Sequence, residues 1–241
     1  MIQLIKNELF KIKSEKFILV IVLLSLIPLS MNLANFIVND SNLSLDKGFY
    51  FRFYNQYLML IPIITSILAA SIFYLEYKNQ TFLNWVSYYN KRHKLFLSKL
   101  LTSYLISTIL ALFNLVAILL FYIINGVTIS DLSKIIISFL ILNFFTIFIM
   151  TVVITFLINL TQNVIIAIVC GIGISLVTMI FMAAPFSYIF PTSLGYRLGL
   201  KFIDPSFYYS SPVTHTIIGF IITLVIFIIF YILSFKTMKV K

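Results

Sequence analysis

Charged residues are scarce in this sequence. Only 10% of its 241 residues are Asp, Glu, Lys or Arg, whereas 61% are hydrophobic, and the mean hydropathy is +1.10. A water-soluble domain is about a quarter charged, so this composition excludes both a soluble enzyme and a disordered chain. The stretch from Ile135 to Tyr196 contains no Asp, Glu, Lys, Arg or His at all. Such continuous apolar runs predict an α-helical integral membrane protein, because the strands of a β-barrel alternate apolar and polar residues.

Residue types that carry chemistry are also few. The one cysteine, Cys170, cannot form an internal disulfide, and the two histidines, His93 and His215, are predicted on opposite sides of the membrane. No H-E-x-x-H motif and no glycine-rich phosphate loop occurs. Ionisable residues are expected only at the ends of the spans, which argues against an ion-coupled transporter and a voltage sensor. The sequence therefore predicts no catalytic residue, no metal site and no cofactor in this chain.

The apolar runs define six membrane-spanning helices, because one span needs about 20 apolar residues. Pro28 and Pro62 fall within or near the ends of the first two spans and can kink them. The predicted fold class is an all-α polytopic membrane protein with a single transmembrane domain, residues 1–241. The expected spans are Phe17–Val38, Tyr57–Leu75, Leu100–Ile124, Ile135–Ile158, Val164–Ala184 and Thr214–Phe235.

The net charge of +10 fits the orientation of a membrane protein better than nucleic-acid binding. With six spans, both termini lie on one side. That side, together with the segment between the second and third spans, carries twelve Lys and Arg residues, and the other side carries five. Because positive loops stay inside, we predict cytoplasmic termini.

Residues 1–16 precede the first span. Ile2, Ile5, Leu9 and Ile12 recur at helical spacing, and the lysines occupy other faces. The pattern is that of an amphipathic helix at a membrane surface. The alternative is a plain basic flank to the first span.

The long internal segment, residues 76–99, collects aromatic and basic side chains. Phe82, Trp85, Tyr88 and Tyr89 follow one another at helical spacings and share one stripe of a short helix. One interpretation is an interfacial aromatic belt with basic anchors, which any multispan protein needs. The other is a helix parallel to the membrane that presents aromatic side chains to a cytoplasmic partner.

Two segments resemble permeases of the type-2 ABC exporter family. They are LIKNELFKIK before the first span and EYKNQTFLNWVSYYNKRHKLFLSKLL after the second. Such permeases begin with a surface helix containing Glu, a hydrophobic residue and Lys. After the second span they carry an acidic residue, a polar turn ending in Thr, and a basic segment before the third span. The matching positions are Glu8, Lys11, Glu76, Lys78, Asn79, Thr81, Lys91, Arg92, Ser98 and Lys99.

The resemblance implies a dimer of permease subunits, each docked on a cytoplasmic ABC ATPase that binds ATP and Mg. Residues 81–89 would be the coupling helix, residues 1–16 the connecting helix, and residues 185–213 an external re-entrant segment. It also implies a bacterial cytoplasmic membrane. The residues expected to dock the ATPase are Glu76, Lys78, Thr81, Phe82, Trp85, Tyr88, Tyr89 and Arg92, with Glu8 and Lys11 in the connecting helix.

Small size, a high content of Ile, Leu and Phe, and short external segments resemble the permeases of lantibiotic-immunity and phenol-soluble-modulin exporters. The acidic and aromatic patterning of polysaccharide exporters is absent. We therefore expect an exporter of membrane-active amphipathic peptides, serving secretion or self-immunity. The alternatives are export of a small hydrophobic antibiotic and a membrane scaffold or pore that needs no partner.

Overall fold

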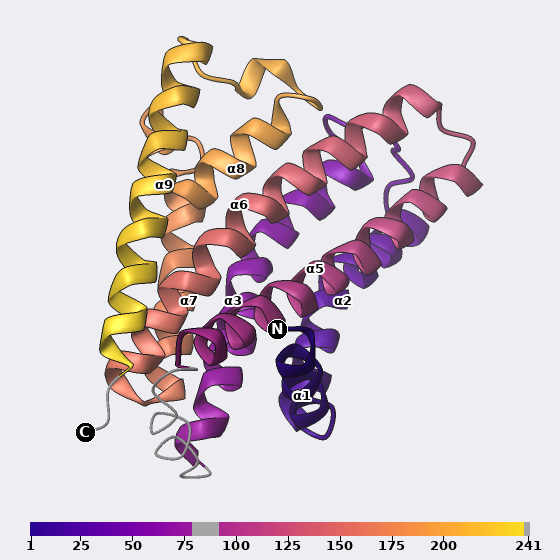
Figure 1. The fold of residues 1–241 in the computed structure, drawn as a ribbon. Helices are drawn as coiled ribbons and strands as arrows, with labels where there is room; N and C mark the ends of the chain where they lie inside the picture. The colour runs from indigo at the N-terminus through magenta and orange to yellow at the C-terminus, as the bar shows by residue number, and fades with distance from the viewer. Residues whose placement is uncertain (79–91, 239–241) are drawn as a thin grey trace.

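The computed structural model describes residues 1–78 and 92–238, and within them the chain forms helices and no strand (Figure 1). The long helices pack side by side in one bundle, and short helices lie at its two ends. The elements are α1 (Ile2–Ile12), α2 (Lys16–Val38), α3 (Phe49–Lys78), α5 (Arg92–Ile124), α6 (Ile129–Thr161), α7 (Val164–Phe181), η2 (Ser187–Ile189), α8 (Pro191–Leu200), η3 (Pro205–Phe207) and α9 (Pro212–Thr237).

Six of these helices are long and apolar enough to cross a membrane. They are α2, α3, α5, α6, α7 and α9, so the predicted all-α polytopic fold is confirmed. α1 lies at the end of the bundle where α3 ends and α5 begins (Figure 1). We call this the proximal end, and the opposite end, which carries α8, the distal end.

Several helices extend well beyond the predicted spans. α3 begins at Phe49 instead of Tyr57, α5 at Arg92 instead of Leu100, and α6 at Ile129 instead of Ile135. Hydropathy finds only the stretch that lies in hydrocarbon, whereas helical hydrogen bonding continues past it. The predicted loop between the second and third spans is shortened accordingly, because Glu76 and Lys99 both lie within helices.

α3 and α6 form the centre of the bundle. Two-thirds (67%) of the most apolar stretch of each is buried against the rest of the protein, compared with 11% for α9 and 22% for α7. α3 packs on α2, α5, α6 and α7, and α6 packs on α5, α7, α8 and α9. The peripheral helices therefore present most of their apolar side chains to the bilayer.

Many polar side chains within the spans bond to the backbone of their own helix. Thr65 Oγ1 donates to the carbonyl of Ile61 at 2.8 Å, and Ser66 Oγ donates to that of Pro62 at 2.6 Å. Asn32 Nδ2 donates to the carbonyl of Pro28 at 2.7 Å. Such bonds matter in a membrane because no water reaches these groups.

The distal half of the core is rich in tyrosine. Tyr50 Oη lies 2.7 Å from Ser138 Oγ, and Tyr57 Oη donates to Asn143 Oδ1 at 2.9 Å. Both tyrosines belong to α3, and both partners belong to α6. Each bond joins the two central helices while the aromatic ring fills the core, which fixes the register between them.

The segment between α7 and α9 contains one short helix that is almost fully buried. α8 packs on α6, α7 and α9, and Arg197 donates from Nε to the carbonyl of Met182 at 2.9 Å and from Nη2 to that of Ala183 at 2.8 Å. Both carbonyls lie where α7 ends. Arg197 thereby joins α8 to the end of α7, while the re-entrant role of residues 185–213 remains a prediction.

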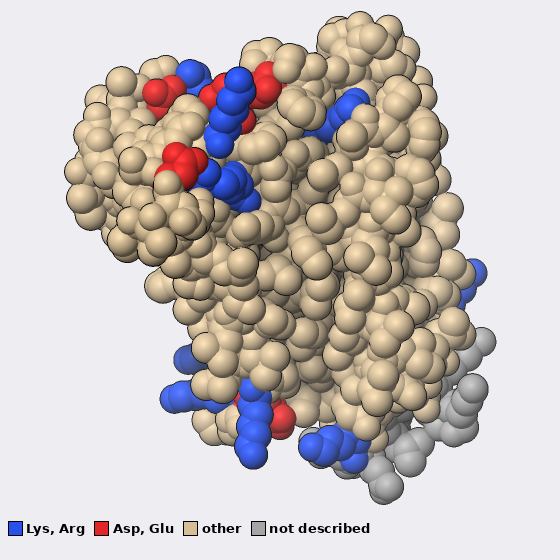
Figure 2. Space-filling model, turned by 180° about the vertical axis from the view of Figure 1, so that it is seen from behind, with Lys and Arg blue, Asp and Glu red and all other residues tan. Residues whose placement is uncertain are grey.

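Charged side chains gather toward the two ends of the bundle. Figure 2 shows Lys, Arg, Asp and Glu on one face near both ends and a broad uncharged band between them. At the distal end Arg52 pairs with Asp40, and Lys134 pairs with Asp131. The uncharged band is the part of the surface that matches the hydrocarbon core of a bilayer.

Gly199 on α8 offers a test of this packing. A Cβ added there would lie against Tyr54 Oη and 2.6 Å from the carbonyl oxygen of Ser138. We expect Gly199→Ala to destabilise the protein by about 1–3 kcal/mol through overpacking, measured as a lower unfolding temperature in detergent. Gly173→Ala is the control, because a Cβ at Gly173 on α7 meets nothing within 4 Å. Equal stability of the two variants would contradict the close packing of α8.

Candidate functional site: a buried charge cluster and a lateral groove

Four charged side chains from three helices meet at the proximal end. α1 contributes Glu8 and Lys11, which are three residues apart and so lie on one face of the helix. α3 contributes Glu76, two residues before its end, and α5 contributes Lys99 from its second turn. We call these four residues the charge cluster.

Lys99 lies at the centre of the charge cluster. Its Nζ is 2.5 Å from Glu8 Oε2, 2.9 Å from Glu76 Oε1 and 3.4 Å from the carbonyl oxygen of Ile72. Lys11 closes the arrangement, because its Nζ donates to Glu8 Oε1 at 3.0 Å and to Glu76 Oε1 at 2.9 Å. Each ammonium group therefore contacts both carboxylates, and the cluster joins α1, α3 and α5.

The charge cluster is buried and electrically balanced. The exposed fraction of the side chain is 1% for Lys99 and 6% for each glutamate, but 48% for Lys11. Two carboxylates and two ammonium groups cancel, which is the condition under which charges can be taken out of water at tolerable cost. Removing one member leaves an uncompensated buried charge.

The pKa of Lys11 reflects its two carboxylate neighbours. Burial lowers the pKa of this ammonium group, but hydrogen bonds to Glu76 and Glu8 and their negative charges outweigh burial, so the pKa is raised above 10.5. A raised pKa means that the folded protein favours the charged form. The stabilisation by Lys11 is therefore fully present below pH 10.5 and is lost only as the pH rises through the raised pKa.

The sequence singled out Glu8, Lys11, Glu76 and Lys99 as separate motif positions but did not predict that they meet. It placed Lys99 at the end of the internal segment 76–99 and assigned no burial to it, whereas the structure buries it completely. A lysine flanked on both sides by apolar residues, as in LFLSKLL, was the signal that could have indicated a paired, buried charge.

Of the remaining predicted docking residues, the structure describes Lys78 and Arg92, and neither belongs to the charge cluster. Lys78 is exposed at the end of α3. Thr81, Phe82, Trp85, Tyr88 and Tyr89 lie outside the described residues. Arg92 begins α5, and its guanidinium lies 5.3 Å from the centre of the Phe235 ring near the end of α9. The contact of all these residues with a partner remains a prediction.

The first turn of α5 is held against α9. His93 Nε2 lies 2.9 Å from Tyr231 Oη, and the ring of Phe96 packs edge-on against the rings of Tyr231 and Phe235. No sequence pattern indicated this contact, because it joins residues more than 130 positions apart. The helix that directly follows residues 79–91 is therefore fastened to the last span.

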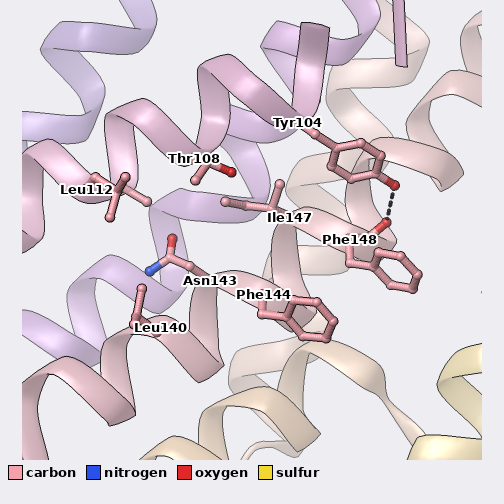
Figure 3. A pocket seen from close by; sticks show the side chains of 9 residues that line it. Tyr104, Thr108, Leu112, Leu140, Asn143, Phe144, Ile147 and Phe148 are labelled. Carbon is pink, nitrogen blue, oxygen red and sulfur yellow. Dashed lines mark hydrogen bonds between the residues drawn. The ribbon is translucent and has the colours of Figure 1, made fainter. Parts of the chain in front are cut away.

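A lateral groove of about 450 Å³ lies between α5 and α6, at the depth of the spans (Figure 3). Leu112 and Phe144 are exposed at its rim, while Ala111 and Asn143 are buried in its floor. Tyr104 Oη donates to the carbonyl of Phe148 at 2.9 Å, which joins the two walls. The residues that line the groove are Tyr104, Thr108, Ala111, Leu112, Leu140, Asn143, Phe144, Ile147 and Phe148.

Neither feature resembles a metal centre or a hydrolytic site. Among residues 1–78 and 92–238, no group of three or more His, Cys, Asp or Glu side chains is placed to hold a metal ion. The charge cluster contains only two carboxylates, and both are occupied by lysines. Its arrangement can transmit force between helices, and the groove can accept an apolar group.

Lys99→Met tests the charge cluster. The substitution leaves two buried carboxylates with only the half-exposed Lys11, so we expect a loss of about 3–5 kcal/mol of stability, measured by thermal unfolding in detergent. Lys94→Met, an exposed position on the same helix, should have little effect. Adding Glu8→Gln to Lys99→Met should restore part of the loss, because one uncompensated charge disappears. A Lys99→Met protein as stable as wild type would show that the pairing is unimportant.

Comparison with known proteins identifies one family. A family model described as ABC-2 family transporter protein matches residues 4–182, which include most of α1, the charge cluster, the lateral groove and five of the six spans. Neither the curated proteins nor the solved structures contain a match to this chain.

Proposed function

The chain belongs to the ABC-2 transporter family as a multi-pass transmembrane permease component, and we propose that it is the permease of an ATP-driven exporter of membrane-active amphipathic peptides. The observation that carries this proposal is the charge cluster, because it ties together the helices on both sides of the segment expected to dock an ATPase. The exporter would either secrete a peptide toxin or remove such a toxin from the membrane to protect the cell.

A cytoplasmic ABC ATPase is the proposed source of energy. The sequence has no phosphate loop of its own, so ATP and Mg would be bound by that partner. We place the partner on residues 79–91 and the adjoining Lys78 and Arg92. Glu76 and Lys99 flank this segment in sequence and pair with each other at 2.9 Å. A displacement of the segment would therefore move α3, α5 and α1 together.

The same displacement would reach the distal end through α9. The proximal end of α9 holds the first turn of α5 through His93 and Tyr231. Its distal end packs on η2 and α8, with the His215 ring stacked on that of Tyr188 at 4.6 Å. A helix behaves as a stiff rod over this length, so motion at the docking segment would shift the buried α8.

The lateral groove supports a peptide as the substrate. It opens toward the bilayer, its walls are apolar and aromatic, and one buried amide, Asn143, lies in its floor. Such a lining accepts the apolar face of an amphipathic helix from the membrane. A hydrated sugar chain would leave its hydroxyl groups without partners there.

A second permease subunit is also proposed, of the same or a related sequence. Polar side chains lie half-buried on α3 beside α2, where Gln56 Oε1 accepts from Asn32 Nδ2 at 2.7 Å. The neighbouring Asn55 is also half-buried but faces α8, where its Oδ1 accepts from Tyr196 Oη at 2.6 Å. Polar groups at the depth of a span are usually turned toward protein or a water-filled path, not lipid. This face is therefore where we place the partner subunit.

The docking hypothesis is tested by purifying the chain together with the products of neighbouring genes. We expect an ATPase subunit to co-elute in equal amount, and Trp85→Ala to release it. Arg92→Ala should uncouple ATP hydrolysis from transport without lowering membrane abundance, because it loosens α5 from α9. Lys94→Ala is the control, since Lys94 is exposed on the same turn. Elution of the chain alone, without ATP hydrolysis, would favour the scaffold or pore.

The substrate hypothesis is tested by filling the lateral groove. Ala111→Trp places an indole on the floor of the groove, and we expect about tenfold weaker protection against amphipathic peptides, the factor given by losing roughly 1.4 kcal/mol of binding. Phe113→Trp is the matched control, because Phe113 is 58% exposed on the same helix and does not line the groove. If Ala111→Trp left protection against amphipathic peptides unchanged but abolished protection against a small hydrophobic antibiotic, the antibiotic would be the better substrate hypothesis.

A further inference from the structure

A second cavity, of about 420 Å³, lies at the distal end between α6, α8 and α9. Its walls are apolar and come mainly from Phe145 on α6, Leu198 on α8, and Ile217 and Phe220 on α9. We call it the distal cavity. It shares no lining residue with the lateral groove or with the charge cluster.

The distal cavity opens sideways toward the bilayer. Val213, Ile217 and Phe220 are 71%, 54% and 43% exposed, and α9 is the span with the smallest buried share. The lining residues of α9 run from Pro212 to Phe220, a rise of about 12 Å in an α-helix. One leaflet of the hydrocarbon core is about 15 Å thick, so the cavity is about as long as an acyl chain lying in one leaflet.

A positive charge stands at the outer rim of the distal cavity. Lys201 follows directly after α8, and its Nζ lies 4.7 Å from the centre of the Tyr208 ring. No salt bridge to Lys201 is found within residues 1–78 and 92–238. The nearby Asp204 is already engaged, because its Oδ1 accepts from the backbone N and the Oγ of Ser206.

Three other cations at this end have partners inside the protein, whereas Lys47, exposed between α2 and α3, has no salt bridge to a described residue but does not line the distal cavity. Arg52 pairs with Asp40, Lys134 lies 2.8 Å from Asp131, and Arg197 donates to two carbonyl groups. Lys201 instead presents its ammonium group above an apolar cavity that faces lipid. The charge and the cavity together match a molecule with one negative group and a hydrocarbon chain.

We propose that the distal cavity binds a phospholipid with an anionic headgroup from the adjacent leaflet. The phosphate lies on the Lys201 ammonium group, and one acyl chain fills the space between α6, α8 and α9. The bound lipid thereby becomes part of the packing that holds α8. A cationic peptide does not fit this site, because Lys201 would repel it, so the distal cavity is distinct from the proposed substrate groove.

The proposal is tested with the full chain purified in a neutral detergent. Phosphatidylglycerol and phosphatidylcholine with identical acyl chains are titrated, and binding is followed by native mass spectrometry and by the unfolding temperature. We expect about fivefold tighter binding of phosphatidylglycerol, the factor that one lysine–phosphate attraction of about 1 kcal/mol gives. Soluble glycerol phosphate should give no shift, because it lacks the acyl chain.

Four variants separate the contributions. Lys201→Gln should abolish the preference for phosphatidylglycerol, and Lys201→Arg should retain it. Lys134→Gln, which removes a distal cation already paired with Asp131, should leave the preference unchanged. Ile217→Trp, which fills the cavity, should weaken binding of both lipids.

Three results would overturn the proposal. The first is equal binding of the two lipids by the wild-type chain. The second is a preference that survives Lys201→Gln. The third is an equal response to glycerol phosphate, which would identify a site for a free anion instead of a lipid.

Discussion

The pairing of one buried lysine with two glutamates supports the rest of the arrangement. Lys99 on α5 reaches Glu8 on α1 and Glu76 on α3, and without it these carboxylates would face a poorly solvated end of the bundle. The ion pairs attach an amphipathic helix to the spans more specifically than apolar contact could, because each carboxylate fixes both a distance and a direction. They also keep the two helices that flank residues 79–91 at a fixed separation. A partner that acts on that segment would meet a rigid unit instead of two independent helices.

Elsewhere in the described part of the bundle, most polar side chains in the spans are hydrogen-bonded, as hydrocarbon favours, although the hydroxyl groups of Ser107, Thr146 and Thr151 have no partner. Thr65 and Ser66 bond to their own helix, and Tyr50 and Tyr57 bond across to α6. A bond within one helix does not position that helix against another, whereas the tyrosine bonds set the register of α3 against α6. These two helices thereby become the fixed centre, and the outer helices remain free to present apolar surface to lipid. The distribution of polar groups thus explains both the stability of the bundle and the exposure of its periphery.

The charge cluster, the lateral groove and the distal cavity have separate chemistry. The charge cluster is neutral and closed, the lateral groove is apolar with an amide in its floor, and the distal cavity is apolar beneath a cation. A transporter that takes an amphipathic peptide from the membrane needs a place for the peptide that does not also attract anionic lipid. Lys201 at the distal cavity, away from the groove, would keep the two proposed ligands apart. α9 lines the distal cavity, and near its other end it contacts α5, the helix that follows the docking segment. It therefore connects the two ends of the molecule.

The sequence by itself determined the fold class and the number of spans, because hydrocarbon selects apolar stretches about 20 residues long wherever they occur. It also singled out Glu8, Lys11 and Glu76 by their resemblance to a family that the match over residues 4–182 then confirmed. The sequence placed the start of α3 about two turns too late. It indicated a loop over residues 49–56 because they include the charged Arg52, which the structure pairs with Asp40. Only the tertiary structure decided that Lys99 is buried among carboxylates, that His93 meets Tyr231, and that Lys201 stands over a cavity. Each of these depends on helices that are far apart in the chain, and hydropathy carries no information about which helices become neighbours.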